Sequence, residues 1–324
     1  MTLSAAWDWL RQTRAHPPGA ASEGEAADAY RAALQQSEDL ALAAETTGRA
    51  ARSLPLFYAF SQAGQAIEAC HGAAGGRRHG LSLVESTGPV LDRELRIYAN
   101  PDGRYQSVSD CVRSARPTTD ETVTLADLIA SLPELAVFLR PDLGMPAPLE
   151  LRQDVALADG GSIVVQVIGD GFEPLWDEAI LLTPHQLTSD EDLRALTGTY
   201  PSSTAMRPEE GAFECLPTID GRWEAMVQVE IGEGGIDAIA SKYRGSRWLR
   251  PLIPPLRDTP SPLMTWWLVT YSLSMLARYH PLDWVKALDV DSSPDAVLLD
   301  RAMMEGLSVL PQLVLEAVTS APQP

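Results

Sequence analysis

The sequence predicts an α+β protein in which N- and C-terminal helices pack together around a strand-rich middle segment. Apolar residues recur at helical spacing before residue 80 and after residue 261. Short β-branched runs bounded by glycine and aspartate lie between these two regions. The chain has 324 residues, of which 45% are apolar, and this composition is typical of a folded protein with one or two domains.

Residues 1–26 are expected to form a flexible N-terminal segment, because turn-forming and small polar residues dominate residues 15–26. We expect residues 27–324 to form a single α+β domain. Within it, a helical pair covers residues 27–80, a mixed, β-rich segment covers residues 81–260, and the C-terminal helices cover residues 261–324.

The helical pair is predicted from an apolar stripe. One helix is expected from Ala27 to about Arg52, and a second begins where Ser53 can cap it and Pro55 fits its first turn. The second helix carries apolar residues at spacings of 4, 3, 4 and 3. These residues are Leu56, Phe60, Ala63, Ile67 and Cys70. The glycine-rich residues after Cys70 end it, which predicts an antiparallel pair.

The middle of the chain changes to strand patterns. Residues 91–98 and 105–108 flank the turn sequence Asn-Pro-Asp-Gly at 100–103, which predicts a β-hairpin. Thr124 with Asp127 resembles a capping box at the start of a short helix, and Ser131 with Glu134 resembles another. Further strands are expected over residues 162–168, 179–182 and 223–231, and short helices over residues 190–196 and 235–240.

A core helix is expected over residues 263–288, bent or ended at Pro281. Its uncharged stretch begins at residue 259, but two early prolines leave about 15 helical residues, fewer than the roughly 20 that span a bilayer. We therefore expect a buried helix and no membrane association. Ser293 and Pro294 begin a last helix that runs to about Val318, with a kink at Pro311.

The formal net charge is −19, which argues against general affinity for nucleic acids or anionic lipids. Arginine supplies 23 of the 25 basic residues, a bias typical of GC-rich bacterial genomes, so each arginine carries less functional information. The three cysteines form no C-x-x-C pair, so we expect reduced thiols, a cytoplasmic location, no metal and no cofactor.

Two polar clusters at the ends of apolar helices are candidates for one binding site. Arg77, Arg78 and His79 lie in a glycine-rich segment, where a freed backbone and cations suit an anion. Arg278 and Tyr279, followed by His280, end the core helix. The alternatives are a mobile surface loop for the first cluster and an arginine that pins helix ends together for the second.

Residues 242–257 are the largest positive stretch of the chain and contain no carboxylate. Arginines interleaved with aromatic residues suit phosphate contact and base stacking. The candidate contact residues are Lys242, Arg244, Arg247, Trp248 and Arg250. The alternative is an ordered loop whose arginines pair with the protein's own carboxylates.

The sequence contains no G-x-S-x-G, Walker A, H-E-x-x-H or Rossmann glycine motif, so whether the protein is an enzyme stays open. Four short segments in order resemble the YaaC-like proteins of bacteria. They are Ser-Leu-Pro-Leu-Phe-Tyr at 53–58, His-Gly-Leu at 79–81, Leu-Pro-Glu-Leu at 132–135, and Ser-Met-Leu-Ala-Arg-Tyr-His-Pro at 274–281 followed by Trp284. The resemblance spans residues 37–288 and implies a cytoplasmic bacterial protein, without implying an activity.

The sequence therefore leaves three hypotheses for the function of the protein. The first is binding of a protein partner or a small anionic ligand at a polar centre near His79 and Arg278. The second is a nuclease or nucleotide-handling enzyme that holds phosphate with residues 242–257. By analogy, helical pairs with arginine and histidine resemble HEPN ribonucleases, but the only R-x4-6-H match, Arg11 to His16, precedes the helical core. The third is a scaffold without ligand or turnover.

Overall fold

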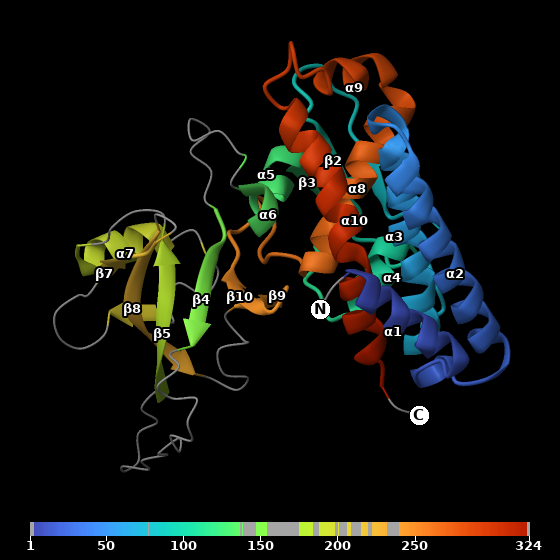
Figure 1. Cartoon of the computed structure of the whole chain (residues 1–324), viewed down its shortest axis with the longest axis horizontal. Coiled ribbons are helices and arrows are strands. Elements are labelled where there is room, and N and C mark those ends of the chain that lie inside the picture. The colour runs from blue at the N-terminus through green and yellow to red at the C-terminus, as the bar shows by residue number, and fades with distance from the viewer. Residues whose placement is uncertain are drawn as a thin grey trace. The chain divides into compact units, whose positions relative to one another are not determined.

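The computed structural model describes residues 3–76, 78–136, 138, 147–153, 175–183, 188–197, 200, 206–208, 215–219, 222–231 and 240–322. The fold class is α+β, as predicted, with helices at both ends of the chain (Figure 1). The chain forms two compact units, where the sequence analysis expects one domain over residues 27–324. The first unit is Met1–Met145 together with Ile253–Pro324, and the second is Pro146–Leu252.

Helices from both ends of the chain pack together in the first unit, which confirms the predicted arrangement. Its helices are α1 (Leu3–Ala15), the 3₁₀-helix η1 (Gly19–Ala21), α2 (Gly24–Thr46), α3 (Arg49–His71), α4 (Arg104–Cys111), α5 (Leu125–Ala130), α6 (Pro133–Ala136), α8 (Pro262–Tyr279), α9 (Pro281–Ala287) and α10 (Ala296–Thr319). Helix α3 contacts α2, α8 and α10 (Figure 1). Both ends of the chain therefore contribute to one helical core.

The N-terminal segment differs from the flexible segment expected over residues 1–26. Residues 3–15 form α1, and Leu10 is fully buried. Arg11 forms an ion pair with Glu38 of α2, and the Thr13 and Tyr30 hydroxyls lie 2.6 Å apart. The prolines and glycines after residue 15 favour a loop in the sequence pattern, but a short helix with a buried leucine and small residues precedes them.

The junction between α2 and α3 lies earlier than the sequence predicts. Helix α3 begins at Arg49 after Gly48, so Ser53 is buried inside the helix and Pro55 lies in its interior. The predicted apolar stripe is confirmed, because all five of its members are buried. The stripe therefore identifies the core face correctly, while the local capping signal at Ser53 misplaces the helix start.

Helix α8 is the buried core helix that the sequence predicts, since every residue from Pro262 to Leu276 is buried. It crosses α3 at Gly64, where a Cβ atom would lie 2.4 Å from the Trp267 ring. Pro281 starts α9 immediately after α8 and His280, which confirms the predicted break. Among the residues described, no helix is both long and apolar enough to cross a membrane.

A small antiparallel sheet in the first unit has the order β1 (Leu81–Leu83), β2 (Glu94–Ile97) and β3 (Glu121–Thr124). The predicted hairpin over residues 91–108 is wrong, because residues 104–111 form α4. Tyr105, Val108 and Ser109 are buried at helical spacing, so packing determines this segment. The predicted cap at Thr124 is confirmed, since its hydroxyl accepts from the Asp127 N–H.

The second unit is an antiparallel sheet with one helix, α7 (Asp190–Thr197), among its described residues. The strand order is β6-β8-β5-β4-β10-β9, and β7 pairs with β8. The strands are β4 (Leu149–Gln153), β5 (Leu175–Thr183), β6 (Met206–Pro208), β7 (Cys215–Pro217), β8 (Trp223–Ile231), β9 (Ser241–Tyr243) and β10 (Ser246–Leu249). The predictions over residues 179–182, 190–196 and 223–231 are confirmed, whereas residues 162–168 and 235–239 lie outside the described part of the chain.

Candidate functional site

The backbone around His79 is held by the first turn of α4. The Arg104 N–H donates to the Arg78 carbonyl at 2.7 Å, and the Tyr105 N–H donates to the His79 carbonyl at 3.2 Å. These are N–H groups of a first helical turn, which have no partner inside the helix. The segment between α3 and β1 is therefore fixed at His79 rather than held only by its two ends.

Gly80 brings this segment against a buried glutamine. The Gln106 side chain is fully buried and donates from Nε2 to the Gly80 carbonyl, at 3.1 Å, and to the Tyr98 carbonyl. Gly80 has a φ of 76°, and a Cβ atom there would lie 1.9 Å from Gln106 Oε1. Glycine is required both by the left-handed backbone and by the lack of space.

Aromatic rings form a wall behind the His79 imidazole. The His79 ring centroid lies 5.5 Å from that of Phe57 and 5.6 Å from that of Tyr271. Phe57 and Tyr271 are themselves 5.2 Å apart in an edge-to-face arrangement. The Tyr271 hydroxyl donates to the Leu81 carbonyl at 2.9 Å, which fixes the wall to β1. His79 is exposed as a residue, while this wall covers one side of its ring.

The same surroundings favour the neutral form of His79 by lowering its pKa. One-sided burial of the ring lowers the pKa of His79 below its ordinary value of 6.5, and the positive charges of Arg104 and Arg278 lower it further. Arg104 begins α4, whose N–H groups bond to the Arg78 and His79 carbonyls, and Arg278 lies in the last turn of α8, which packs against the His79 ring through Tyr271. A neutral imidazole offers one hydrogen-bond donor and one acceptor, and an approaching anion would favour its protonation.

The arginines around His79 differ in how they are already paired. Arg104 Nε lies 3.3 Å from Glu68, whose buried carboxylate also accepts from the Gly76 N–H at 2.9 Å. Arg278 is exposed and lies over the Tyr279 ring, with its guanidinium carbon 5.0 Å from the ring centroid. No described residue forms an ion pair with Arg278, so its N–H groups are open to a ligand.

The remaining residues of the two predicted clusters take different positions. Arg78 is exposed, and Tyr279 is 60% exposed beside Arg278. The backbone of His280 joins α8 to α9, where its N–H donates to the Leu276 carbonyl. Arg77 lies outside the described residues. Sequence reasoning missed Arg104, although an arginine directly after the Asn-Pro-Asp-Gly turn is a signal once that turn is interpreted as a helix start.

The predicted contact residues Lys242 to Trp248 of the basic segment lie on the β9–β10 hairpin of the second unit, where Lys242 and Arg244 are exposed. Arg250 is 4% exposed, and Arg244, Arg247 and Arg250 each interact within the protein. Trp248 is half-buried on β10, opposite Glu150 of β4, and Lys242 on β9 is exposed. Arg257 belongs to the first unit. Lys242 of β9 and Arg247 of β10 lie opposite each other in the sheet, so two of the candidates are neighbours. Phosphate contact by this segment stays a prediction.

The cysteines and the acidic side chains form no metal centre in the described part of the chain. Within those residues, no group of three or more histidine, cysteine, aspartate and glutamate side chains is arranged to hold a metal ion. Cys70, Cys111 and Cys215 are free thiols. Burial raises the pKa of Cys70 to about 12, which makes its thiol unreactive at neutral pH.

The fold defines an α+β protein whose two terminal helical regions pack together, with His79 against the aromatic rings of α3 and α8. Comparison with protein-family models identifies the family of the chain. The model of the YaaC-like Protein family matches residues 4–156 and 177–318, which is most of the chain, so the protein belongs to this family. No curated protein and no solved structure matches the chain.

Proposed function

We propose that this protein binds a small anionic ligand at the polar centre formed by His79, Arg104 and Arg278. One arrangement carries the proposal: the His79 ring packs against Tyr271 of α8, the helix that ends beside the exposed Arg278, and the Arg104 backbone bonds to the neighbouring Arg78 carbonyl. This concentration of positive charge occurs in a chain with a net charge of −19. A phosphate or carboxylate is the group that such an arrangement attracts.

Each side chain has a distinct role in this proposal. Arg278 supplies open N–H groups, and its stacking on Tyr279 orients the planar guanidinium. Arg104 is positioned by the buried Glu68 and adds a second charge. His79 donates a hydrogen bond and becomes protonated when an anion approaches, so affinity should rise as the pH falls toward the lowered pKa of His79.

The test is a binding titration by calorimetry with inorganic phosphate and with citrate as probes. Arg278→Gln should lower the affinity about tenfold or more, because it removes a charge-assisted hydrogen bond. Lys286→Gln is the matched control, since Lys286 is exposed on the neighbouring helix and does not affect the pKa of His79. Equal affinities for the wild type and Arg278→Gln would contradict the proposal.

A protein partner could present its carboxylate or phosphate to the same surface. Pull-down with the wild type and with Arg278→Gln distinguishes this occupant, because a complex lost in the variant would use the site. The nuclease hypothesis predicts instead that RNA or DNA is cleaved and that binding weakens steeply with salt. Equal background cleavage by the wild type and Arg278→Ala would exclude Arg278 as a catalytic residue.

We also propose a cytoplasmic location. Three free cysteines support it, since unpaired thiols are typical of reducing compartments.

A further inference from the structure

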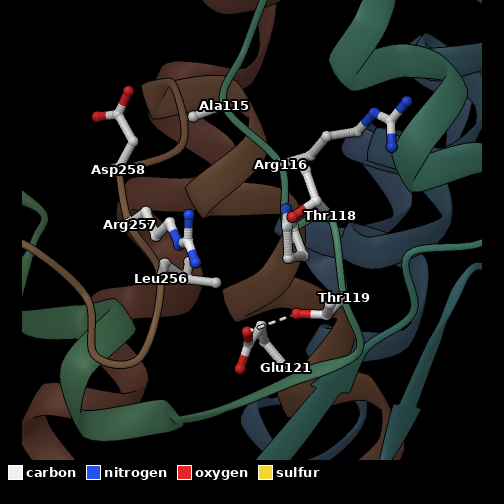
Figure 2. A pocket seen from close by; sticks show the side chains of 9 residues that line it. Ala115, Arg116, Thr118, Thr119, Glu121, Leu256, Arg257 and Asp258 are labelled. Atoms are coloured by element: carbon white, nitrogen blue, oxygen red, sulfur yellow. Dashed lines mark hydrogen bonds between the residues drawn. The ribbon is translucent and has the colours of Figure 1, made fainter.

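A hollow in the first unit lies between two loops and involves neither His79 nor Arg278. One loop joins α4 to β3 and supplies residues 115–119 and Glu121, and the other precedes α8 and supplies residues 256–258 (Figure 2). The hollow has a volume of about 180 Å³. Pro117 and Leu256 are buried and give it an apolar lining.

Of the four charged side chains at this hollow, Arg116 is in an ion pair, and Asp258 is turned away. Arg116 donates from Nε to Asp110 Oδ1 at 2.6 Å and from Nη2 to Oδ2 at 3.2 Å, which is a bidentate ion pair. Asp258 accepts from the Thr259 N–H at 2.8 Å. Both side chains extend away from the middle of the hollow (Figure 2). Arg257 and Glu121 are therefore the charged side chains that extend toward the middle of the hollow.

Arg257 and Glu121 extend into the hollow from opposite loops (Figure 2). Glu121 Oε1 accepts from the Thr119 hydroxyl at 2.9 Å, which orients the carboxylate. Arg257 is exposed and forms no ion pair with Glu121 or with any other described residue. The hollow thus contains a guanidinium, that of Arg257, and a carboxylate, that of Glu121. Thr119 orients the carboxylate, and the two groups do not form a salt bridge with each other.

This arrangement discriminates by charge. A simple anion would be attracted by Arg257 but repelled by Glu121. A simple cation would be attracted by Glu121 but repelled by Arg257. A molecule that carries both charges satisfies both side chains at once. Cavities of about 150 Å³ hold molecules the size of benzene, so this hollow has room for a small amino acid but not for a nucleotide.

We propose that the hollow binds a small zwitterion of the α-amino acid class. The carboxylate of the ligand pairs with Arg257, its ammonium group pairs with Glu121, and a short side chain packs against Pro117 and Leu256. This site is separate from the proposed anion site at His79, and either can exist without the other.

The test uses L-alanine with two probes that each carry one of its charges, propionate and ethylamine. Ligand-observed NMR on the full chain should show binding of alanine at millimolar concentrations and at least tenfold weaker binding of each single-charge probe. Arg257→Gln and Glu121→Gln should each weaken alanine binding about tenfold. Asp39→Asn is the matched control and should leave binding unchanged, because Asp39 is exposed on α2 and does not line the hollow.

Three results would overturn the proposal. They are equal binding of propionate and alanine, unchanged binding in Glu121→Gln, and no binding of alanine to the folded wild type. Unchanged melting curves of the variants establish that a loss reflects the site rather than unfolding. His79→Gln should retain alanine binding, which separates this result from any failure of the anion site.

Discussion

Replacing Gly80 with alanine tests how the fold positions His79. The left-handed backbone at Gly80, with φ of 76°, costs alanine about 1–2 kcal/mol. The added Cβ would also lie 1.9 Å from Gln106 Oε1, so the buried glutamine must move. Moving it breaks its hydrogen bonds to the Gly80 and Tyr98 carbonyls, at about 1 kcal/mol each. The expected loss in the free energy of unfolding is about 3–4 kcal/mol.

Gly24→Ala is the matched control, because Gly24 has a φ of 67° but no atom within 4 Å of the position that a Cβ would take. Gly24→Ala should lower the free energy of unfolding only by the cost of the left-handed backbone, about 1–2 kcal/mol. The assay is urea unfolding followed by helical circular dichroism, which reports on the first unit because that unit holds the long helices. Equal destabilisation by Gly80→Ala and Gly24→Ala would refute the packing argument.

Three further predictions concern the same unit. Trp284→Ala should lower the free energy of unfolding by about 3–5 kcal/mol, measured by urea unfolding, because the ring is buried and its Nε1 donates to the Ala50 carbonyl at 2.8 Å. In the same assay Asp283→Ala should destabilise more than Arg93→Met, since it leaves the 3% exposed Arg93 without its carboxylate partner at 2.8 Å. Stability should fall as the pH drops below 6.5, because the unfolded chain protonates His79 more readily than the folded one, and thermal melts of His79→Gln should show a smaller fall.

The helical core could be predicted from the sequence because its apolar periodicity is long and regular. The stripe from Leu56 to Cys70 and the uncharged α8 both lie in the core as expected. The segment at 104–111 could not be predicted in the same way. An Asn-Pro-Asp-Gly turn usually joins strands, and only the burial of Tyr105 and Val108 at helical spacing shows that a helix follows it here.

The candidate site was predictable in part. The positions of His79 and Arg278 at the ends of apolar helices indicated that the two could share one polar centre. Arg104 and the aromatic wall of Phe57 and Tyr271 were not predicted, because they join the site through tertiary contacts between α3, α4 and α8. For the basic residues around β9 and β10, the sequence did not show that Arg250 is buried or that Arg244 and Arg247 interact within the protein.

The measurement that tests the central claim most directly is an NMR titration of the His79 imidazole. The wild type should titrate with a pKa below 6.5, and Arg278→Gln should raise that pKa, because it removes one of the two positive charges that act on the ring. Lys286→Gln should leave it unchanged, and saturating inorganic phosphate should raise it in the wild type. A His79 pKa that is the same in the wild type and Arg278→Gln would show that the two residues do not form one site.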